Sequence, residues 1–327
     1  MSGTEPAAIL LTGASGFVGQ RIAPRLAAAA PPGARLVALC RSMAPDGWTA
    51  AAADIADADA IAALIAHERP RVVVHLAAQS SIGAAVGAGA ATWQVNALGA
   101  FALARACALH APEAVVLFAS SGEVYGDSFL AGPVDEDAPP RPKNSYARSK
   151  VAAEGMFADI LAPTNRLLIA RAFNHTGAGQ DTRFVLPSFA QQIAAIEAGN
   201  QRPVMQVGNL DAARDFLDVE DVCDAYLALL ANTDRLPAQA IFNVASGRAY
   251  RIGDLLLRLR DLSGTRFEIT IDPTRLRPSE IPTAVGRNDR LAEATGWAAK
   301  RSIDALLSEL LGAARRRQTL ALPTSPQ

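Results

Sequence analysis

The chain has 327 residues and a formal net charge of −1 at pH 7, from 31 Lys and Arg against 32 Asp and Glu. Hydrophobic residues make up 50% of it and charged residues 19%, which excludes a disordered chain and supplies enough apolar surface for a large core. The near-neutral charge lacks the basic field that nucleic-acid binding needs, so we expect no nucleic-acid partner. The length exceeds what one compact core usually holds, so we expect a large domain that carries a smaller one.

Cysteine and histidine are sparse and scattered. Cys40, Cys107 and Cys223 form no C-x-x-C pair, and no two of the four histidines stand at i and i+4. The pattern therefore predicts neither a disulfide framework nor a metal site. The N-terminal MSGTEPAAILL lacks a basic segment, and no apolar run approaches the ~18 residues of a membrane span. We expect a cytoplasmic protein with no membrane contact.

Short β-rich runs alternate with alanine-rich helical stretches through the first half of the chain. The expected strands are Ala8–Thr12, Arg35–Leu39, Arg71–Leu76, Val115–Ser120 and Leu167–Ala170. The expected helices between them span about 16–30, 57–68, 93–110 and 145–161. Several strands are continuous apolar runs, as strands covered on both faces should be. The alternation predicts an α/β fold with a doubly wound parallel sheet.

The rhythm changes after residue 172 and partly returns later. A helix over Asp218–Leu230 and a strand over Ala240–Ala245 resemble the earlier elements, so we assign them to the first domain. The predicted division is 1–172 plus about 216–246 for the dinucleotide domain, and about 173–215 plus 247–312 for a smaller α/β substrate lobe. This lobe would cover the carboxyl ends of the strands, where ligands bind in such sheets. Residues 313–327 lack periodicity and are expected to be a frayed tail.

A glycine motif follows the first strand directly. The sequence Thr12-Gly13-Ala14-Ser15-Gly16-Phe17-Val18-Gly19 leads from the strand into the first helix. Glycine permits the tight turn, the approach of backbone to a pyrophosphate and the close packing of helix on strand. The phosphates then lie at a helix N-terminus, whose free N–H groups favour anions. In this βαβ context the motif predicts a dinucleotide site of the Rossmann type.

The end of the second strand bears on the choice of dinucleotide. NAD-binding folds usually have an acidic residue there, whereas this chain has Cys40-Arg41-Ser42. Arginine and a hydroxyl suit a 2′-phosphate, so the sequence favours NADP(H) over NAD(H), although Arg41 could also be a solvated loop charge. Asp54 and Ile55 follow a further strand that we expect just before them, and they could hold the adenine; Asp54 could equally be a helix N-cap.

Tyr146 and Lys150 lie four residues apart on one predicted helix, and Ser121 closes the preceding strand. Side chains at i and i+4 share a helical face. A lysine charge beside a phenol would stabilise phenolate, so we expect Lys150 to lower the pKa of Tyr146 until it exchanges protons near neutrality. The pattern is common on amphipathic helices, and its position after Ser121 and the glycine motif is what gives it meaning.

Together these motifs resemble the extended short-chain dehydrogenase/reductase family that acts on nucleotide sugars, over essentially the whole chain. The resemblance rests on the glycine motif, His75-Leu76-Ala77-Ala78, Asn96, the Ser121 turn and the Tyr146/Lys150 pair. It implies that Ser121 hydrogen-bonds the reacting oxygen, Tyr146 transfers the proton, and Lys150 tunes Tyr146 and binds the nicotinamide ribose. The dinucleotide contacts it implies are Gly13, Ser15, Gly16, Phe17, Val18, Gly19, Arg41, Ser42, Asp54, Ile55, Leu76, Ala77, Ala78, Asn96, Tyr146 and Lys150. Asn96 would support the active-site helix, unless it is an ordinary capping or turn amide.

The second half is similar to the branch of this family that acts on GDP-mannose derivatives. The matching segments are Ala170–His175, Phe184-Val185, Val207–Leu210, Arg214–Asp218 and Leu276–Glu280. The substrate contacts that follow are Ser80, Ser121, Asn174, Val185, Asn209, Arg214, Arg277 and Glu280. Arg214 and Arg277 are long donors able to grip a diphosphate, or else members of structural ion pairs.

This branch contains 4,6-dehydratases and reductases of the 4-keto-6-deoxy sugar. Glu123 is the residue that is compatible with both activities. Dehydratases use a glutamate there to remove the C5 proton, but similar reductases can also carry it. Three departures from the dehydratase pattern favour the reductase: Leu186 to Ser188 in place of a basic pair, Phe216 in place of Trp, and a short Cys40-Arg41-Ser42 loop. The resemblance then implies reduction of GDP-4-keto-6-deoxy-D-mannose by NADPH, with Glu123 as an added catalytic candidate.

Other readings remain beside this one. Hydride attack on one face of the ketone would give GDP-D-rhamnose and on the other the 6-deoxy-talose epimer, and the sequence does not choose. Another nucleotide-sugar epimerase or reductase is a further alternative. A non-enzymatic dinucleotide sensor is disfavoured because Ser121, Tyr146 and Lys150 are all present. The resemblance also implies a homodimer, in which the helices near 93–110 and 145–161 pair as a four-helix bundle.

Overall fold

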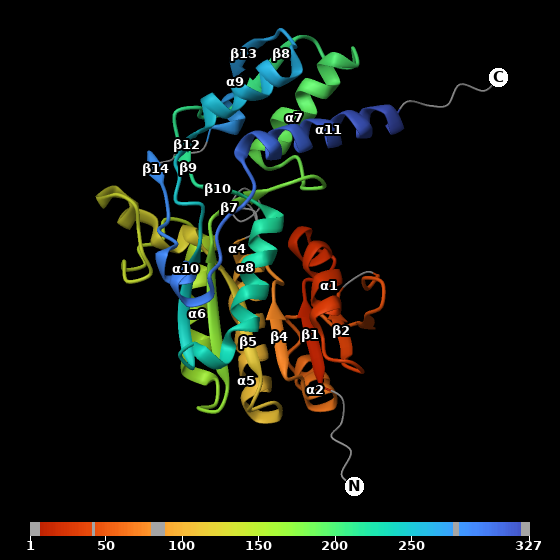
Figure 1. Ribbon diagram of the computed structural model, residues 1–327, viewed down its shortest axis with the longest axis vertical. Coiled ribbons are helices and arrows are strands. Elements are labelled where there is room, and N and C mark those ends of the chain that lie inside the picture. The colour runs from red at the N-terminus through yellow and green to blue at the C-terminus, as the bar shows by residue number, and fades with distance from the viewer. Residues whose placement is uncertain (1–6, 41–42, 80–88, 277–280, 322–327) are drawn as a thin grey trace, which may run out of the picture.

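The computed structural model describes residues 7–40, 43–79, 89–276 and 281–321. Its centre is a parallel seven-stranded sheet in the order β11-β6-β5-β4-β1-β2-β3 (Figure 1). The strands are β1 Ala8–Thr12, β2 Arg35–Leu39, β3 Thr49–Ala51, β4 Val72–His75, β5 Val115–Ser121, β6 Arg166–Ala172 and β11 Gln239–Val244. Every residue of β1 is buried, because helices cover both faces of the sheet. The predicted doubly wound α/β fold is confirmed.

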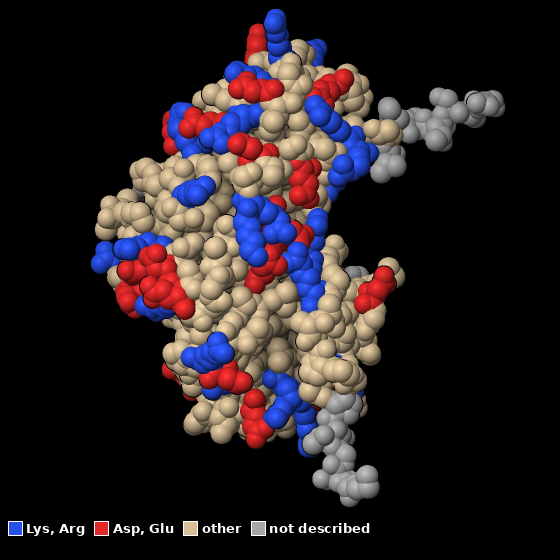
Figure 2. Space-filling view, in the orientation of Figure 1, with Lys and Arg blue, Asp and Glu red and all other residues tan. Residues whose placement is uncertain are grey.

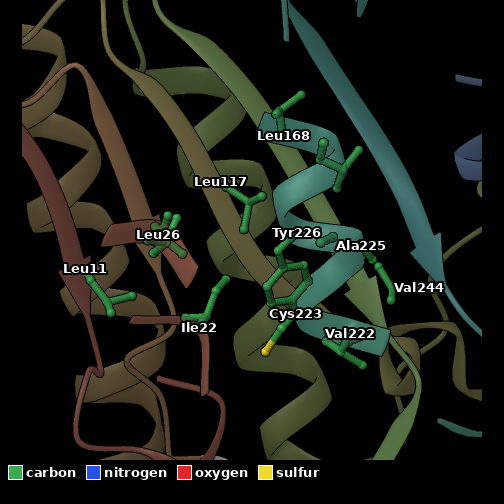
Figure 3. Packing of buried hydrophobic residues seen from close by; sticks show 14 of the residues in the cluster. Leu11, Ile22, Leu26, Leu117, Leu168, Val222, Cys223, Ala225, Tyr226 and Val244 are labelled. Atoms are coloured by element: carbon green, nitrogen blue, oxygen red, sulfur yellow. The ribbon is translucent and has the colours of Figure 1, made fainter. Parts of the chain in front are cut away.

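Two hydrophobic clusters hold the helices to the sheet. One face carries α1 Phe17–Ala29, α8 Val219–Ala231 and α10 Asp289–Thr295; the other carries α2 Ala58–Glu68, α5 Gly99–His110 and α6 Ser145–Ile160 (Figure 1). On the first face, Tyr226 of α8 lies among apolar side chains of the sheet that include Leu117 and Val244 (Figure 3). On the second face, Ile61 and Phe157 pack against the buried strands. The alternating pattern of the sequence thus produces one layered core.

A third cluster lies beyond the carboxyl ends of the strands, in the upper part of Figure 1. It joins α7 Val185–Glu197, α9 Ile252–Ser263 and α11 Ile303–Ala321, with β8 Val204–Val207 paired to β13 Glu268–Ile271. Short strands connect it to the sheet: β7 Asn174–Thr176 with β10 Phe216–Asp218, and β9 Ala213–Arg214 with β12 Tyr250–Arg251 and β14 Thr283–Ala284. Single-turn or 3₁₀ segments occur at η2 Gly122–Ala131, η3 Thr233–Arg235 and η4 Pro273–Arg275.

The helix predicted over 93–110 consists of three pieces. They are α4 Gly89–Trp93, the π-helical turn η1 Gln94–Leu98 and α5. A π-turn inserts an extra residue into the helical ladder and commonly occurs at functional sites. Here it carries the buried Asn96, so the interruption coincides with a residue that the family pattern had singled out.

Two expectations about the second half are wrong. Residues 313–321 are not frayed, because α11 continues to Ala321 and buries Leu310 and Ala314 against the third cluster. In addition, α10 and Trp297 do not belong with the smaller lobe: Leu291 and Trp297 are part of the first cluster, and Trp297 Nε1 donates to Asp221 O at 3.1 Å. Both errors arose because short amphipathic segments do not reveal which neighbour covers them. The remaining domain boundaries stay a prediction.

None of the helices within the described ranges is both long and apolar enough to cross a membrane.

Candidate active site

The site residues gather where the strand order reverses. β1 lies between β2 and β4, so the loops that leave the carboxyl ends of β1 and β4 part toward opposite faces of the sheet. Such a switch point is where open α/β sheets bind ligands. The glycine motif follows β1, the Leu76–Ala78 segment follows β4, and Ser121 ends β5. The topology therefore brings three separate sequence motifs to one edge.

The glycine loop needs glycine for reasons that the geometry makes explicit. Gly13 has φ +72°, and a Cβ there would lie 2.7 Å from the backbone N of Ala77. A Cβ at Gly19 would collide with the carbonyl oxygens of Gly13 and Ala14. The absence of a side chain at Gly13 lets the end of β1 approach the loop after β4, and its absence at Gly19 lets α1 pack against the turn. Any side chain would push one of these backbones away.

The N-terminus of α1 is suited to an anion. Gly16 is the N-cap, no side chain caps the helix, and its first turn holds no acidic residue. Phe17 and Val18 form that first turn, and Ser15 is exposed beside it. Uncapped backbone N–H groups and the helix dipole favour phosphate. The residues present thus fit the diphosphate of a dinucleotide.

A hydrogen-bonded link behind the glycine loop was missed by the sequence analysis. Thr12 Oγ1 lies 2.7 Å from His75 Nδ1 and accepts a bond from the backbone N of Ala77 at 3.2 Å. His75 is 1% exposed; burial, followed by the charge of Lys150, lowers its pKa to about 3. The imidazole is therefore neutral and serves to fix the two strand ends. A threonine at the end of a buried strand gave no signal of this role.

The predicted adenine pair Asp54 and Ile55 lies after β3. Ile55 is buried and packs against Gly99, where a Cβ would stand 3.0 Å from Ile55 Cγ1. Asp54 is exposed, and its Oδ1 accepts from Ala56 N at 3.0 Å. The alternative use of Asp54 as a helix N-cap is wrong, because the N-cap of α2 is Asp57. Arg41 and Ser42 lie outside the described residues.

Ser121 and Tyr146 meet at the end of β5. Their side chains are hydrogen-bonded, and both are buried to within 9% exposure. Tyr146 is in the first turn of α6, which begins where Asn144 Oδ1 accepts from Ala147 N at 2.8 Å. Burial, the largest cause, raises the pKa of Tyr146 to about 12, and the charge of Glu123 adds to the rise while the bond to Ser121 opposes it. The phenol therefore holds its proton at neutral pH.

Lys150 does not act on Tyr146 as the sequence analysis expected. Its Nζ donates to Ala119 O at 2.7 Å and lies 4.7 Å from the centre of the Phe118 ring. Burial lowers the pKa of Lys150 to about 8. The expected drop in the pKa of Tyr146 is contradicted, because desolvation of the phenol raises it and the group that opposes the rise is Ser121. Helical spacing placed the two residues on one face but could not reveal which acceptor the ammonium would choose.

Asn96 ties the loop after β4 to the active-site helix. Its Oδ1 accepts from Gln79 N at 2.7 Å, and its Nδ2 donates to Ser149 Oγ at 3.0 Å and to Gln79 O at 3.3 Å. Ser149 in turn donates to Tyr146 O at 2.7 Å. The amide is 1% exposed and these bonds use it fully. Through Ser149 it supports α6, which is the role that the family resemblance implied.

Glu123 and Arg214 face one another across the site. Burial is the main reason that the pKa of Glu123 is raised; the Arg214 charge and a 3.4 Å bond from Asn144 Nδ2 oppose the rise. Arg214 Nη1 donates to Ala213 O at 2.7 Å and to Ile281 O at 3.2 Å. Arg214 therefore anchors β9 near β14 while its charge reaches toward Glu123.

The other predicted substrate residues are spread over several elements. Asn174 is exposed at the start of β7, and Val185 begins α7. Asn209 Oδ1 accepts a hydrogen bond from Asp211 N at 2.8 Å, so the Asn209 side chain stabilises a turn. Ser80, Arg277 and Glu280 lie outside the described residues.

Asp215 and Glu154 are buried acidic residues that were not predicted as site residues. Asp215, beside Arg214, is fully buried and accepts from Ser246 N at 2.8 Å, from Ser246 Oγ at 2.7 Å and from Gly247 N at 3.0 Å. It thus ties β9 to the segment after β11. Glu154, one turn beyond Lys150 on α6, pairs with Arg171 of β6. An acidic residue inside an apolar helical face was the available signal for Glu154.

Away from these residues, a hollow of about 600 Å³ opens along the outer edge of β11, lined mainly by apolar groups such as Leu167 and Phe242 together with Arg290. Arg235 also lines it, and it contains none of the predicted site residues. On the face in Figure 2, basic and acidic side chains are interspersed, so that face carries no single-sign field. Within the described part of the chain, no three His, Cys, Asp or Glu residues gather as metal ligands.

Comparison with known proteins agrees with this layout. The model of the NAD dependent epimerase/dehydratase family matches residues 9–245. A GDP-6-deoxy-D-mannose reductase of Pseudomonas aeruginosa is 38% identical over 92% of this chain and 96% of its own length. A UDP-glucose 4-epimerase of Azospirillum brasilense is 27% identical over 89% of this chain and 87% of its own. The structure of RMD from P. aeruginosa complexed with NADPH superposes with a TM-score of 0.81 and 35% identity over 95% of this chain and 99% of that one.

Proposed function

Because the chain belongs to the NAD dependent epimerase/dehydratase family, we propose that it reduces the C4 ketone of GDP-4-keto-6-deoxy-D-mannose with NADPH. The product is GDP-6-deoxy-D-mannose, that is GDP-D-rhamnose, a precursor for glycan synthesis. The observation that carries the proposal is the hydrogen bond between Tyr146 and Ser121, at the strand edge that also holds the glycine loop. The P. aeruginosa reductase, similar over nearly its full length, supports this choice of substrate.

The dinucleotide would lie with its diphosphate at the uncapped N-terminus of α1, over Gly13 and Gly16. When bound, it supplies the hydride for the ketone carbon. Ala77 and Lys150 line the approach from that loop toward Tyr146 in the proposed arrangement. We propose NADPH rather than NADH because Arg41 and Ser42 suit a 2′-phosphate, and because one similar structure is described with NADPH. Dissociation constants for both nucleotides test the preference.

In the proposed reaction the protein manages charge on the sugar oxygen. As the C4 carbonyl gains an electron pair, Tyr146 gives its phenolic proton to that oxygen, and Ser121 holds the oxygen by a hydrogen bond. The high pKa of Tyr146 keeps the acid form available at neutral pH. The Lys150 ammonium, fixed by Ala119 O, offsets the phenolate that Tyr146 becomes. Arg214, and Arg277 as the sequence suggests, would grip the diphosphate.

Dehydration of GDP-mannose is the second candidate, and Glu123 is the observation that favours it. The carboxyl group stands close enough to Tyr146 to influence its pKa. Elimination needs a base; burial, the largest cause, raises the pKa of Glu123, and the Arg214 charge opposes the rise. A raised pKa is compatible with both roles, so the choice of reduction rests on the similar P. aeruginosa reductase and on the departures from the dehydratase pattern at Leu186 to Ser188 and at Phe216. Epimerase chemistry is a further alternative because UDP-glucose 4-epimerases are also similar to the chain.

A paired assay distinguishes these activities. One arm offers GDP-mannose alone, and the other offers GDP-4-keto-6-deoxy-D-mannose with NADPH; fluorescence follows NADPH and chromatography follows the sugar nucleotide. We expect equimolar loss of NADPH and a GDP-6-deoxyhexose in the second arm only, with the product sugar revealing which face is attacked. Formation of the keto sugar in the first arm without net NADPH change would make the protein a dehydratase. Tight NADPH binding with no turnover of any keto sugar would point to a sensor.

We also propose a cytoplasmic homodimer that pairs α5 and α6 across a two-fold axis. Leu98, Phe101 and Leu109 support this, because they stand on one side of the helix with exposures of 57%, 41% and 63%. Large apolar groups grouped in this way favour a partner helix. Light scattering should give twice the chain mass, and Phe101→Arg should give the monomer. A monomeric wild-type protein at micromolar concentration would contradict the dimer.

A further inference from the structure

The buried ion pair of Glu154 and Arg171 lies directly behind the proposed catalytic residues. Glu154 is 6% exposed on α6 and Arg171 is 3% exposed on β6. The guanidinium binds the carboxylate through two bonds, Nε to Oε1 at 3.0 Å and Nη2 to Oε2 at 2.7 Å, and it lies 4.8 Å from the centre of the Tyr125 ring. Apolar side chains of similar volume often serve stability as well as a buried ion pair does. Stability alone therefore does not account for this pair.

The position of Glu154 on α6 matches the end of β5. Three consecutive strand residues are each bound by one α6 side chain: Ala119 O by Lys150, Ser120 Oγ by Glu154, and Ser121 by Tyr146. The three helix residues are four apart, so they form one row along the helix. Glu154 thus holds Ser120, which lies between the acceptor of Lys150 and the partner of Tyr146 on β5.

Glu154 also sets the charge environment of Lys150. Burial favours the neutral amine, and the Glu154 carboxylate is the group that opposes this effect. The other titratable neighbours do not help: His75 on β4 is neutral, Tyr146 on α6 keeps its proton, and Arg171 on β6 carries a like charge. Among these neighbours, only the Glu154 carboxylate favours the ammonium.

We propose that Glu154 is a positioning residue of the reduction: its carboxylate preserves the charge of the buried Lys150 and holds the Ser121 end of β5 against Tyr146. Glu154 acts through Lys150 and Ser120 rather than by contact with substrate, and Arg171 orients its carboxylate. The effect on turnover rests on the proposed function, whereas the effect on Lys150 requires no substrate. The two parts can therefore be tested separately.

The composition makes Lys150 directly observable. The chain contains only three lysines, Lys143, Lys150 and Lys300, so ¹³Cε-lysine labelling of the full chain gives three resonances to follow in an NMR pH titration. In the wild type, Lys150 should titrate at about 8. Glu154→Gln keeps the shape and removes the charge, so the pKa of Lys150 should fall by about 1 unit or more. Lys143 and Lys300 serve as internal references whose titrations should not move.

The same variant should change the pH profile of turnover. With GDP-4-keto-6-deoxy-D-mannose and NADPH, the alkaline fall in kcat should move to lower pH by the amount that the Lys150 titration moves. Glu154→Asp, which restores the charge, should return most of the shift, whereas a purely structural role would lower kcat equally at every pH. A folded Glu154→Gln protein in which Lys150 titrates as in the wild type would overturn the proposal.

If Glu154→Gln does not fold, Arg171→Gln tests the charge from the opposite side. Without the Arg171 cation, the Glu154 carboxylate interacts with Lys150 alone, so the pKa of Lys150 must rise above its wild-type value. No change or a fall would overturn the proposal. If the Lys150 shift appears but the wild type does not reduce the keto sugar, the proposed function fails and the role of Glu154 toward Lys150 stands.

Discussion

The dinucleotide side and the catalytic side of the site are built in different ways. At the glycine loop, backbone geometry makes the site: Gly13 and Gly19 matter because no side chain fits there, and α1 offers bare N–H groups. At the end of β5, side chains make the site, and Tyr146, Glu123 and Arg214 come from α6, η2 and β9. A backbone site can be recognised in a short sequence. A side-chain site depends on how distant segments pack and on which charges they bury.

Tyr146→Phe tests the catalytic side most severely. It removes one hydroxyl and its proton, so kcat should fall roughly 10²- to 10⁴-fold while NADPH affinity is retained. Steady-state kinetics and fluorescence titration measure the two quantities. Arg258→Gln, which breaks a surface pair with Asp304, is the control and should keep wild-type kcat. Unchanged turnover in Tyr146→Phe would remove Tyr146 from the mechanism.

Gly13→Ala tests the backbone side. A Cβ at φ +72°, 2.7 Å from Ala77 N, should lower the free energy of unfolding by about 1–3 kcal/mol and weaken NADPH binding as the loop shifts. Gly33→Ala is the control: φ is +80° there, but nothing lies within 4 Å of the added Cβ. It should cost about 1–2 kcal/mol of stability and leave NADPH affinity unchanged. Equal losses of affinity in both variants would show that the close approach to Ala77 is unimportant.

Arg214→Gln separates substrate binding from dinucleotide binding. Loss of a charged donor should raise KM for the GDP-sugar about 10- to 100-fold, the equivalent of roughly 1.5–3 kcal/mol, with little change in NADPH affinity. The pKa of Glu123 should rise further, because the cation that lowers it is gone. Arg258→Gln, which breaks a surface pair with Asp304, is the control and should leave KM alone. An unchanged KM in Arg214→Gln would make this arginine a structural anchor.

Asp54→Asn should give the smallest effect. The amide still offers an oxygen to Ala56 N, so the turn remains and only an exposed charge is lost. NADPH affinity should change less than about twofold, in line with the small worth of exposed charges. Isothermal titration calorimetry measures it. A tenfold loss would mean that the dinucleotide side also relies on a charged side chain.

The sequence determined the parts of the protein that short-range physics controls. Continuous apolar runs gave the buried strands, and β1 and β2 have the predicted bounds. Glycine spacing predicted the loop, because a turn with no room for a Cβ requires glycines at positions close together in the sequence. The four-residue spacing of Tyr146 and Lys150 gave their shared helical face.

Tertiary structure alone decided how those side chains behave. Packing buried Tyr146 until its pKa rose instead of falling, and turned Lys150 toward Ala119 O. It carried α10 back to the large core, extended α11 through residues expected to fray, and placed Glu154 between Ser120 and Arg171. Burial and electrostatic partners depend on segments far apart in the chain, so local pattern names the candidate groups while the fold sets their protonation and their contacts.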